Sequence, residues 1–275
     1  MTRSDGWVDL HSHLVPGVDD GSRSLGESMD AIERLIESGV SRLVTTPHVA
    51  ASLLARPEAS ERRLSEIEAA WGRVWSLWEG DERRPFLGLG TEVLLDVPRP
   101  DVSDPRCRIE GGRYVLVEFP HSMLPPGSED ALYYVRRQDA VPVIAHVERY
   151  NFGVDRESVW REWRDAGAVF QVNVASLAGK YGRRAHEAAW ALLEGGWVEL
   201  IGSDYHARGN PAISEGVEAL RERGAAEQLE ILYRENPARI LAGEDLLEVD
   251  PVEALADRSG GGVFGFFRRM TGGER

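Results

Sequence analysis

Near its start the sequence reads Trp7-Val8-Asp9-Leu10-His11-Ser12-His13, an apolar run of strand length that ends in two histidines one residue apart. Side chains alternate between the two faces of a strand, so this spacing directs both imidazole rings to the same side. Adjacent histidines would diverge. The stretch therefore predicts a short strand whose downstream end presents two rings together.

Apolar runs of strand length recur along the chain and alternate with longer segments of helical period, which predicts a parallel sheet with helices packed outside it. The expected strands are seven: 7–11, 42–46, 86–93, 114–119, 141–146, 169–173 and 198–204. Helices are expected over 59–78, 129–137, 156–165, 184–194 and 214–223, with another ending at Gly39. Such units can close into a barrel or spread as an open doubly wound sheet, and periodicity leaves both possibilities open.

Side chains that favour metal ions lie at the downstream ends of six of the seven expected strands. They are His11, His13, His48, Glu92, Glu118, His146, Asp204 and His206. In parallel barrels the downstream loops surround one mouth, so residues far apart in the sequence converge there. Strand 169–173 ends with Gln171 and Asn173 instead, which suit substrate binding or the orientation of ligands. Imidazole and carboxylate groups without thiolates are typical of a hydrolytic site for manganese, iron or zinc.

Longer motifs resemble the manganese-dependent bacterial protein-tyrosine phosphatases of capsule and exopolysaccharide loci, within the polymerase-and-histidinol-phosphatase (PHP) superfamily. The motifs are His11-Ser12-His13-Leu14-Val15-Pro16-Gly17-Val18-Asp19-Asp20-Gly21, Thr45-Thr46-Pro47-His48, Glu118-Phe119, His146-Val147-Glu148-Arg149 and Ser203-Asp204-Tyr205-His206. The resemblance covers most of residues 7–245. It implies an α/β fold, a distorted seven-stranded (β/α)7 PHP barrel with its metal site at the carboxyl ends of the strands. The expected domains are this barrel over 1–250 and a tail over 251–275.

The resemblance also implies how the ligands divide among up to three divalent ions, with manganese expected and iron or zinc as alternatives. The implied sets are His11, His13, Glu92 and Asp204 for one ion, Glu92 as a bridge with Glu118 and His146 for a second, and Asp20, His48 and His206 for a third. Four ligand carboxylates would repel one another without cations. Three divalent ions reverse the sign of the charge, which suits a phosphate monoester dianion.

The activity implied is hydrolysis of a phosphomonoester, in which a metal-bridging water loses a proton and attacks phosphorus in line. Arg149 is the candidate for gripping phosphate with its planar guanidinium group, and a salt bridge at the rim is its alternative role. Arg208 is a second candidate for substrate binding, although the loop spacing around it departs from the family pattern. Asp19 is expected to support its loop. By resemblance, the substrate is phosphotyrosine on an autophosphorylated bacterial tyrosine kinase of polysaccharide biosynthesis.

Charge and composition restrict the remaining possibilities. A formal net charge of −14 opposes binding to nucleic acid, and 42% hydrophobic residues suffice for one substantial core. Cys107 is the single cysteine, so no intramolecular disulfide can form. The sequence shows neither an export signal nor an apolar stretch approaching the roughly 20 residues of a membrane span. We therefore expect a cytoplasmic protein.

The composition changes after Val249-Asp250-Pro251. Ser259-Gly260-Gly261-Gly262 is followed by Val263-Phe264-Gly265-Phe266-Phe267-Arg268-Arg269-Met270, which predicts a flexible linker and a short apolar-basic tail. Two interpretations of residues 259–275 stand beside each other: peripheral docking to a membrane-bound kinase or to the bilayer surface, and a tail without function.

Other activities compete with this interpretation. Cys107-Arg108-Ile109-Glu110-Gly111-Gly112-Arg113 matches the cysteine, five residues, arginine pattern of an unrelated class of tyrosine phosphatases. Such a loop normally leads into a helix, whereas this one precedes the expected strand 114–119 and places Glu110 where a dianion would bind. A small-molecule phosphatase such as a histidinol-phosphate phosphatase, a nuclease, and a non-catalytic metal-binding regulatory domain are further alternatives. The acidic surface disfavours the nuclease.

Overall fold

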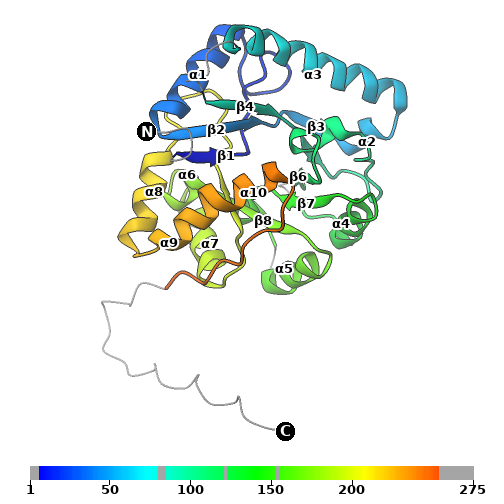
Figure 1. Ribbon diagram of the computed structural model, residues 1–275. Coiled ribbons are helices and arrows are strands. Elements are labelled where there is room, and N and C mark those ends of the chain that lie inside the picture. Colours follow the sequence, from blue (N-terminus) through cyan, green and yellow to red (C-terminus); the bar gives the residue numbers. More distant parts are fainter. Residues whose placement is uncertain (1–5, 80–84, 121–122, 153–154, 254–275) are drawn as a thin grey trace, which may run out of the picture.

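Parallel strands linked by helices form the part of the chain that the computed structural model describes, residues 6–79, 85–120, 123–152 and 155–253 (Figure 1). The strands are β1 (Trp7–Asp9), β2 (Val40–Thr45), β3 (His48–Ala50), β4 (Phe86–Leu89), β5 (Glu92–Leu94), β6 (Tyr114–Glu118), β7 (Val141–Ile144), β8 (Val169–Asn173) and β9 (Leu200–Gly202). They form two sheets of order β1-β2-β4 and β3-β5-β6-β7-β8-β9. Every pair of neighbours in these sheets is parallel, which confirms the expected α/β class.

Each of the seven expected runs contains a strand, but the run over 86–93 is divided into β4 and β5, and β3 follows β2 after a break at Pro47. Proline has no backbone N–H to donate, so it interrupts a strand of a sheet. The pairing nevertheless continues through the break, because the N–H of Gly90 donates to Thr45 O at 2.9 Å and that of Glu92 donates to Pro47 O at 3.1 Å. The two sheets are therefore joined through a pair of bent strands.

Backbone contacts also join the last strand to the first. Ser12 and Tyr205 form a parallel bridge beyond the ends of β1 and β9. The N–H of Asp204 donates to His11 O at 2.8 Å, and that of His13 donates to Tyr205 O at 2.9 Å. The downstream ends of β1 and β9 consequently lie side by side, although the two strands are far apart in the sequence.

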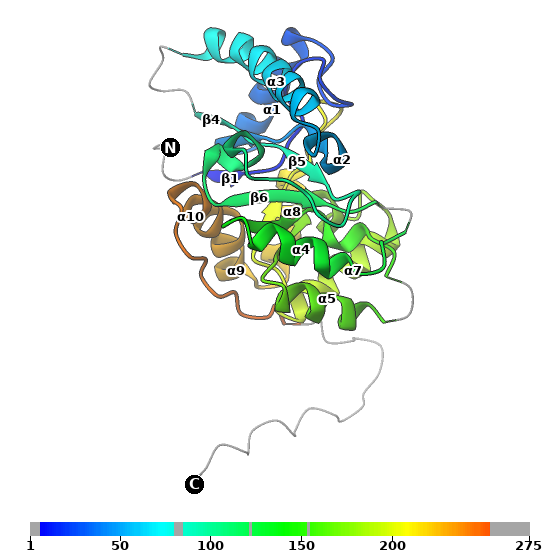
Figure 2. The ribbon, with the colours of Figure 1, turned by 90° about the vertical axis from the view of Figure 1, so that its right-hand side faces the viewer.

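Helices surround the strands on several sides, with α1 and α3 above them and α4, α5 and α7 below them in Figure 1, as the turned view in Figure 2 also shows. The helices are α1 (Leu25–Glu37), α2 (Ala51–Leu54), α3 (Pro57–Trp78), α4 (Ser128–Arg136), α5 (Arg156–Asp165), α6 (Val174–Leu177), α7 (Arg183–Glu194), α8 (Ile213–Glu222), α9 (Ala226–Glu230) and α10 (Asn236–Ala242). All six expected helices are present. Helix α1 begins at the N-cap Ser24, whose side chain accepts from the N–H of Glu27, and is followed by Gly39 at φ +95°.

The buried apolar side chains form two clusters. The smaller one combines residues of several strands, including Val8, Val44, Leu116, Val143 and Leu200, which alternate with neighbours that face the helices. The larger cluster lies between strands and helices. Strands that bury both faces are typical of parallel sheets, and here they hold the downstream strand ends in fixed positions.

The described chain ends shortly after the boundary at which the tail was expected to begin. Val252 is buried, and its N–H donates to Leu193 O of α7 at 3.0 Å. Residues 259–275, for which docking was considered, lie outside the described residues. Within the described ranges, no helix combines the length and the apolar character needed to cross a bilayer.

We expect Gly216→Ala and Gly72→Ala, two substitutions inside helices, to change stability in opposite directions. A Cβ at Gly216 of α8 would lie 2.4 Å from Val174 Cγ2 and 2.5 Å from Val174 O, whereas a Cβ at Gly72 of α3 would meet nothing within 4 Å. Urea denaturation should show a free energy of unfolding lowered by about 1–3 kcal/mol for the first and raised by about 0.5–1 kcal/mol for the second. Equal shifts would contradict the packing of α8 on α6.

Candidate metal centre

Nine imidazole and carboxylate side chains meet around the downstream ends of β1, β6, β7 and β9 and the starts of β3 and β5, and they are the nine residues expected as metal ligands. Their ligand atoms form four overlapping groups in which all atoms lie within 4.8 Å of one another. The groups are His13, Asp20, His48 and His206; His11, His13 and Glu92; His11, His146 and Asp204; and His48, Glu92 and Glu118. Strands β1, β3, β5, β6, β7 and β9 each end or begin at one of these residues or within two of it.

The implied division among three ions can be compared with these groups. Asp20, His48 and His206 fall into one group, which His13 also joins. Asp204 Oδ1 lies 3.4 Å from the Nε2 atoms of both His11 and His13. Glu92 approaches the same two nitrogens, so the four side chains of the first implied set lie together.

The second implied set is close to Glu92 as well. His146 Nε2 lies 3.0 Å from Glu92 Oε1 and 3.8 Å from Glu118 Oε2, so the three side chains face one another. His48 also approaches this set, because its Nδ1 lies 3.2 Å from Glu118 Oε1. The structure thus brings together all the members of each set but does not separate the sets sharply.

Glu92 is at the centre of the cluster and is fully buried. Its Oε2 atom lies 3.3 Å from His11 Nε2, 3.3 Å from His13 Nε2 and 3.1 Å from His48 Nδ1. The distances are short, yet among the described residues neither Glu92 Oε2 nor His48 Nδ1 has a hydrogen-bond partner. A buried polar atom without a partner is costly, and a cation between these atoms would satisfy both. The donor set therefore fits a metal ion.

Two histidines are oriented by acceptors outside the cluster. His11 Nδ1 lies 2.9 Å from Gln171 Oε1, and His13 Nδ1 lies 2.9 Å from Asp19 Oδ2. Each oxygen accepts a hydrogen bond from Nδ1–H, which leaves the Nε2 atoms of both rings facing Glu92. Such contacts fix the tautomer and the ring orientation of metal-binding histidines.

Asp19 does more than the structural role that the sequence suggested. Its carboxylate also accepts from the N–H of Gly21 at 3.0 Å and from the N–H of His48 at 3.2 Å. Burial alone would raise the pKa of Asp19, but the hydrogen bond and positive charge of His13 lower that pKa to about 2. Asp19 therefore stays an acceptor at neutral pH. Its position beside Asp20, within the motif that begins at His11, was the available signal for this role.

Gln171 and Asn173 of β8 connect several members of the cluster. Gln171 Oε1 accepts from the backbone N–H of His146 at 3.2 Å, and Gln171 Nε2 donates to Asn173 Oδ1 at 3.0 Å. Asn173 Nδ2 then donates to Asp204 Oδ2 at 2.9 Å. Of the two roles considered for these residues, the contacts support the orientation of ligands.

The backbone is strained where two members of the cluster leave their strands. His146 has φ 38° and Asp204 has φ 52°, both in the left-handed region that residues with a Cβ seldom adopt. This conformation re-aims each side chain after a parallel strand has ended. Strain of this kind persists where surrounding contacts enforce it, commonly at functional sites.

The carboxylates give the cluster a strongly negative field. Burial lowers the pKa of His48, but the nearby carboxylates of Glu118 and Glu92 outweigh it and raise that pKa to about 10. In the reverse direction, the imidazoles hold the pKa of Glu92 well below its usual range, although burial opposes them. The centre thus favours positive charge, which protons or metal ions can provide.

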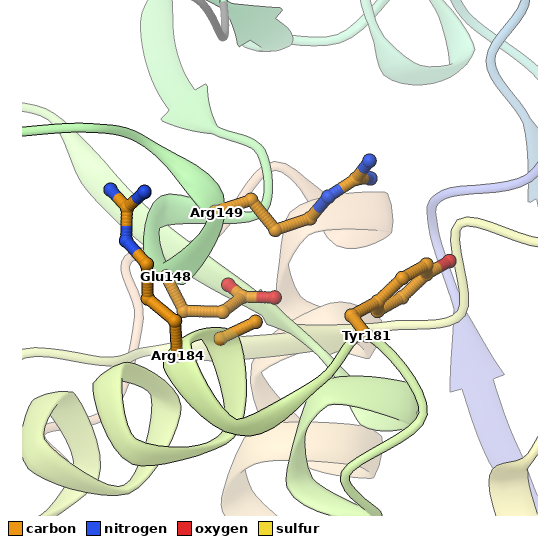
Figure 3. A pocket seen from close by; sticks show the side chains of 5 residues that line it. Glu148, Arg149, Tyr181 and Arg184 are labelled. Carbon is orange, nitrogen blue, oxygen red and sulfur yellow. The ribbon is translucent and has the colours of Figure 1, made fainter.

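Arg149 lies at the edge of the cluster, at the end of the turn η3 (Val147–Arg149). Its Nη1 donates to Asp204 Oδ2 at 2.8 Å, and its guanidinium carbon lies 4.7 Å from the ring centroid of Tyr181. The side chain is 28% exposed and lines a cavity of about 270 Å³ with Glu148, Tyr181, Arg184 and Ala185 (Figure 3). Both roles considered for Arg149 are compatible with this position, because the salt bridge itself links it to the cluster.

Arg208 is exposed at the rim of the same region. Its Nη2 donates to the backbone carbonyl of Asp20, so the side chain contacts the loop that carries a member of the cluster.

Cys107 lies in an environment unlike that of a nucleophile. The thiol is completely buried, and burial, together with the charges of Asp104 and Asp101, raises its pKa to about 12. Glu110 Oε1 accepts from the N–H of Leu89 at 2.6 Å, so the acidic side chain of this loop is hydrogen-bonded to strand β4. Reactive cysteines are accessible and carry lowered pKa values. The geometry therefore excludes the competing cysteine-based interpretation.

Comparison with known proteins places this geometry in a family. Residues 7–242 match the family described as "Capsular polysaccharide synthesis, CpsB/CapC". The chain is 25% identical over 263 residues to the tyrosine-protein phosphatase YwqE of Bacillus subtilis (strain 168), which covers 94% of this chain and 100% of that protein. It is 24% identical over 243 residues to the tyrosine-protein phosphatase CpsB of Streptococcus pneumoniae, covering 85% and 98% respectively.

A solved structure has a similar fold. It comes from the crystal structures of YwqE from Bacillus subtilis and CpsB from Streptococcus pneumoniae, described as unique metal-dependent tyrosine phosphatases. The TM-score is 0.69 at 22% identity, and the alignment covers 90% of this chain and 99% of the other. Because the family match spans nearly all of the described residues, the chain belongs to the CpsB/CapC family of capsular polysaccharide synthesis.

Proposed function

We propose that this protein is a metal-dependent protein-tyrosine phosphatase that acts on an autophosphorylated bacterial tyrosine kinase of polysaccharide synthesis. Relatives of similar length carry the name tyrosine-protein phosphatase. The observation that carries the proposal is the convergence of three imidazole nitrogens on the buried Glu92 Oε2, within a cluster of nine metal-ligand side chains.

For the fold, we propose a seven-stranded PHP-type barrel as one domain over residues 1–250, with 251–275 as a tail. Support comes from the bent pairs β2-β4 and β3-β5, whose pairing is continuous, and from the contacts between the ends of β1 and β9. Closing the ring in this way would place all the strand ends around one mouth.

For the cofactor, we propose up to three divalent ions, manganese above iron or zinc, held by the nine side chains in the sets that the family resemblance implies. Imidazole and carboxylate groups suit these ions. When bound, such ions activate water and stabilise charge on phosphoryl oxygens. Gln171 and Asp19 would keep the Nε2 atoms of His11 and His13 directed at them.

Arg149 is proposed to bind the phosphoryl oxygens. Asp204 and the ring of Tyr181 hold its guanidinium group at the edge of the cluster, so little side-chain freedom is lost when phosphate binds. A planar, permanently charged group can donate two parallel hydrogen bonds to a phosphate. Arg208, whose Nη2 donates to the backbone carbonyl of Asp20, is proposed as an accessory substrate contact.

The proposed activity is tested with para-nitrophenyl phosphate and manganese on a matched pair of histidine variants. His146→Gln changes a residue of the cluster, and we expect it to lower the manganese-dependent kcat/KM by at least about 100-fold. His186→Gln is the control, because His186 lies on helix α7 outside the cluster, where its Nδ1 is 3.1 Å from Ser176 O of α6. Hydrolysis without added metal, or equal rates for both variants, would refute the metal-dependent mechanism.

The same assay separates the substrate classes. With the enzyme saturated in manganese, kcat/KM should be higher for a phosphotyrosine peptide than for histidinol phosphate. The reverse order would replace the tyrosine phosphatase with a small-molecule phosphatase.

Metal binding should weaken as the pH falls. With its pKa raised to about 10, His48 carries a proton at pH 7 before a cation binds, and binding at its ring must displace that proton. Apparent affinity is expected to drop about ten-fold per pH unit for each displaced proton below that pKa. Calorimetric titration with manganese at pH 7, in two buffers of different ionisation enthalpy, counts the released protons. Identical heats in the two buffers would show that no proton leaves.

Cys107→Ser should keep the manganese-dependent rate of hydrolysis. The buried hydroxyl is expected to lower the free energy of unfolding by about 1–3 kcal/mol, because it replaces a thiol in an apolar environment. Rates are therefore compared at 25 °C, after circular dichroism has shown that both proteins are folded. A loss as large as that of His146→Gln would restore the cysteine-based mechanism.

A further inference from the structure

Two neighbouring cavities lie beside the candidate metal centre and share two residues. The first, of about 270 Å³, is the one that Arg149 lines. The second, of about 160 Å³, is lined by Phe152, Arg156 and Trp160, among others. Glu148 and Arg184 line both cavities, so Arg184 lies at their junction.

Arg184 is held in place by neutral groups. Its Nη2 donates to Tyr150 O at 3.0 Å and to Asn151 Oδ1 at 3.2 Å, both on the segment that follows η3. Among residues 6–79, 85–120, 123–152 and 155–253, no carboxylate forms an ion pair with it. The side chain is exposed at the start of α7. Its charge is therefore fixed in position and not neutralised by an acidic partner.

The two arginines of the first cavity have different surroundings. In Figure 3 the guanidinium group of Arg149 extends toward Tyr181, whereas that of Arg184 extends away from it on the other side of Glu148. Arg149 is paired with Asp204 of the cluster, whereas the hydrogen bonds of Arg184 within the described part of the chain go to the segment after η3. Arg149 is thus suited to the phosphoryl group, while Arg184 is suited to a second negative group of the same substrate.

The acidic residues of the two cavities do not cancel this charge. Glu148 is buried, and its Oε1 is already bound within the protein, where it accepts from Ser176 Oγ at 2.6 Å and from the N–H of Asn173 at 3.1 Å. The carboxylate of Glu187 is exposed and forms an ion pair with Arg183, whose Nη1 lies 3.7 Å from Glu187 Oε1. Arg156 adds another cation to the second cavity, 5.3 Å from the centroid of the Trp160 ring. The cavities thus carry a local positive charge on a chain whose net charge is −14.

We propose that Arg184 and the two cavities form a peptide subsite that binds an acidic side chain close to the phosphotyrosine. The inference rests on the proposed tyrosine phosphatase function and specifies its substrates. If the phosphorylated side chain binds at Arg149, the adjoining peptide would lie over the first cavity and contact the ring of Tyr181. The apolar side chains of the second cavity would offer further contact surface. A fixed arginine there discriminates by charge, since a guanidinium group forms strong hydrogen bonds with a carboxylate.

The test compares two phosphotyrosine peptides that differ only in glutamate or glutamine at the positions flanking the phosphotyrosine. The wild-type enzyme should prefer the glutamate peptide by about ten-fold in kcat/KM, mainly through KM. Arg184→Gln should reduce this ratio to about one. Arg62→Gln is the control, because Arg62 is an exposed arginine of α3 that lines neither cavity; that variant should keep the wild-type ratio.

Charge reversal provides a second measurement. Arg184→Glu should prefer a peptide with flanking lysines over the glutamate peptide, which loss of folding could not produce. An unchanged ratio in Arg184→Gln would overturn the subsite. An equal proportional loss on both peptides and on para-nitrophenyl phosphate would overturn it as well, because Arg184 would then act on the phosphoryl group. A wild-type enzyme that hydrolyses para-nitrophenyl phosphate but neither peptide would instead refute the proposed tyrosine phosphatase function, and the subsite with it.

Discussion

A buried carboxylate surrounded by imidazoles is the arrangement on which the rest of this structure depends. Three ring nitrogens lie 3.1 to 3.3 Å from Glu92 Oε2, inside a core where an uncompensated charge is strongly unfavourable. The fold must therefore hold several charged groups together that would otherwise remain in water. Parallel strands end close together at this place, and hydrogen bonds from Nδ1 to Gln171 and Asp19 orient the rings of His11 and His13.

Much of this arrangement could be predicted from the sequence, because it follows from the periodicity of side chains on strands and from the ends of parallel strands. The spacing of His11 and His13, and the position of Glu118 at the end of β6, carried that information. The division between β4 and β5 was not foreseen, although Gly88 and Gly90 lie within the 86–93 run, and strand β3 after Pro47 was not expected. The orienting role of Asp19 was missed because it depends on a contact across a loop whose conformation the sequence did not reveal.

Short elements were also missed for a physical reason. Helices α2 and α6 have four residues each, fewer than periodicity needs to distinguish a helix from a turn. Helices α9 and α10 flank a π-helical segment, Ile231–Glu235, whose register departs from the ordinary helical repeat. The motif around Cys107 was disfavoured from the sequence, because a strand follows it and Glu110 lies within it. The burial of the thiol agrees with that argument.

The left-handed backbone at His146 and Asp204 has a consequence for how this protein can evolve. Glycine would occupy either position with less strain, so selection for thermal stability alone would favour glycine there. Because the cluster needs the imidazole of His146 and the carboxylate of Asp204, the chain keeps a strained backbone conformation at these two residues. Stabilised descendants of this chain would therefore be expected to accumulate their compensating changes elsewhere, in helices and loops remote from β7 and β9.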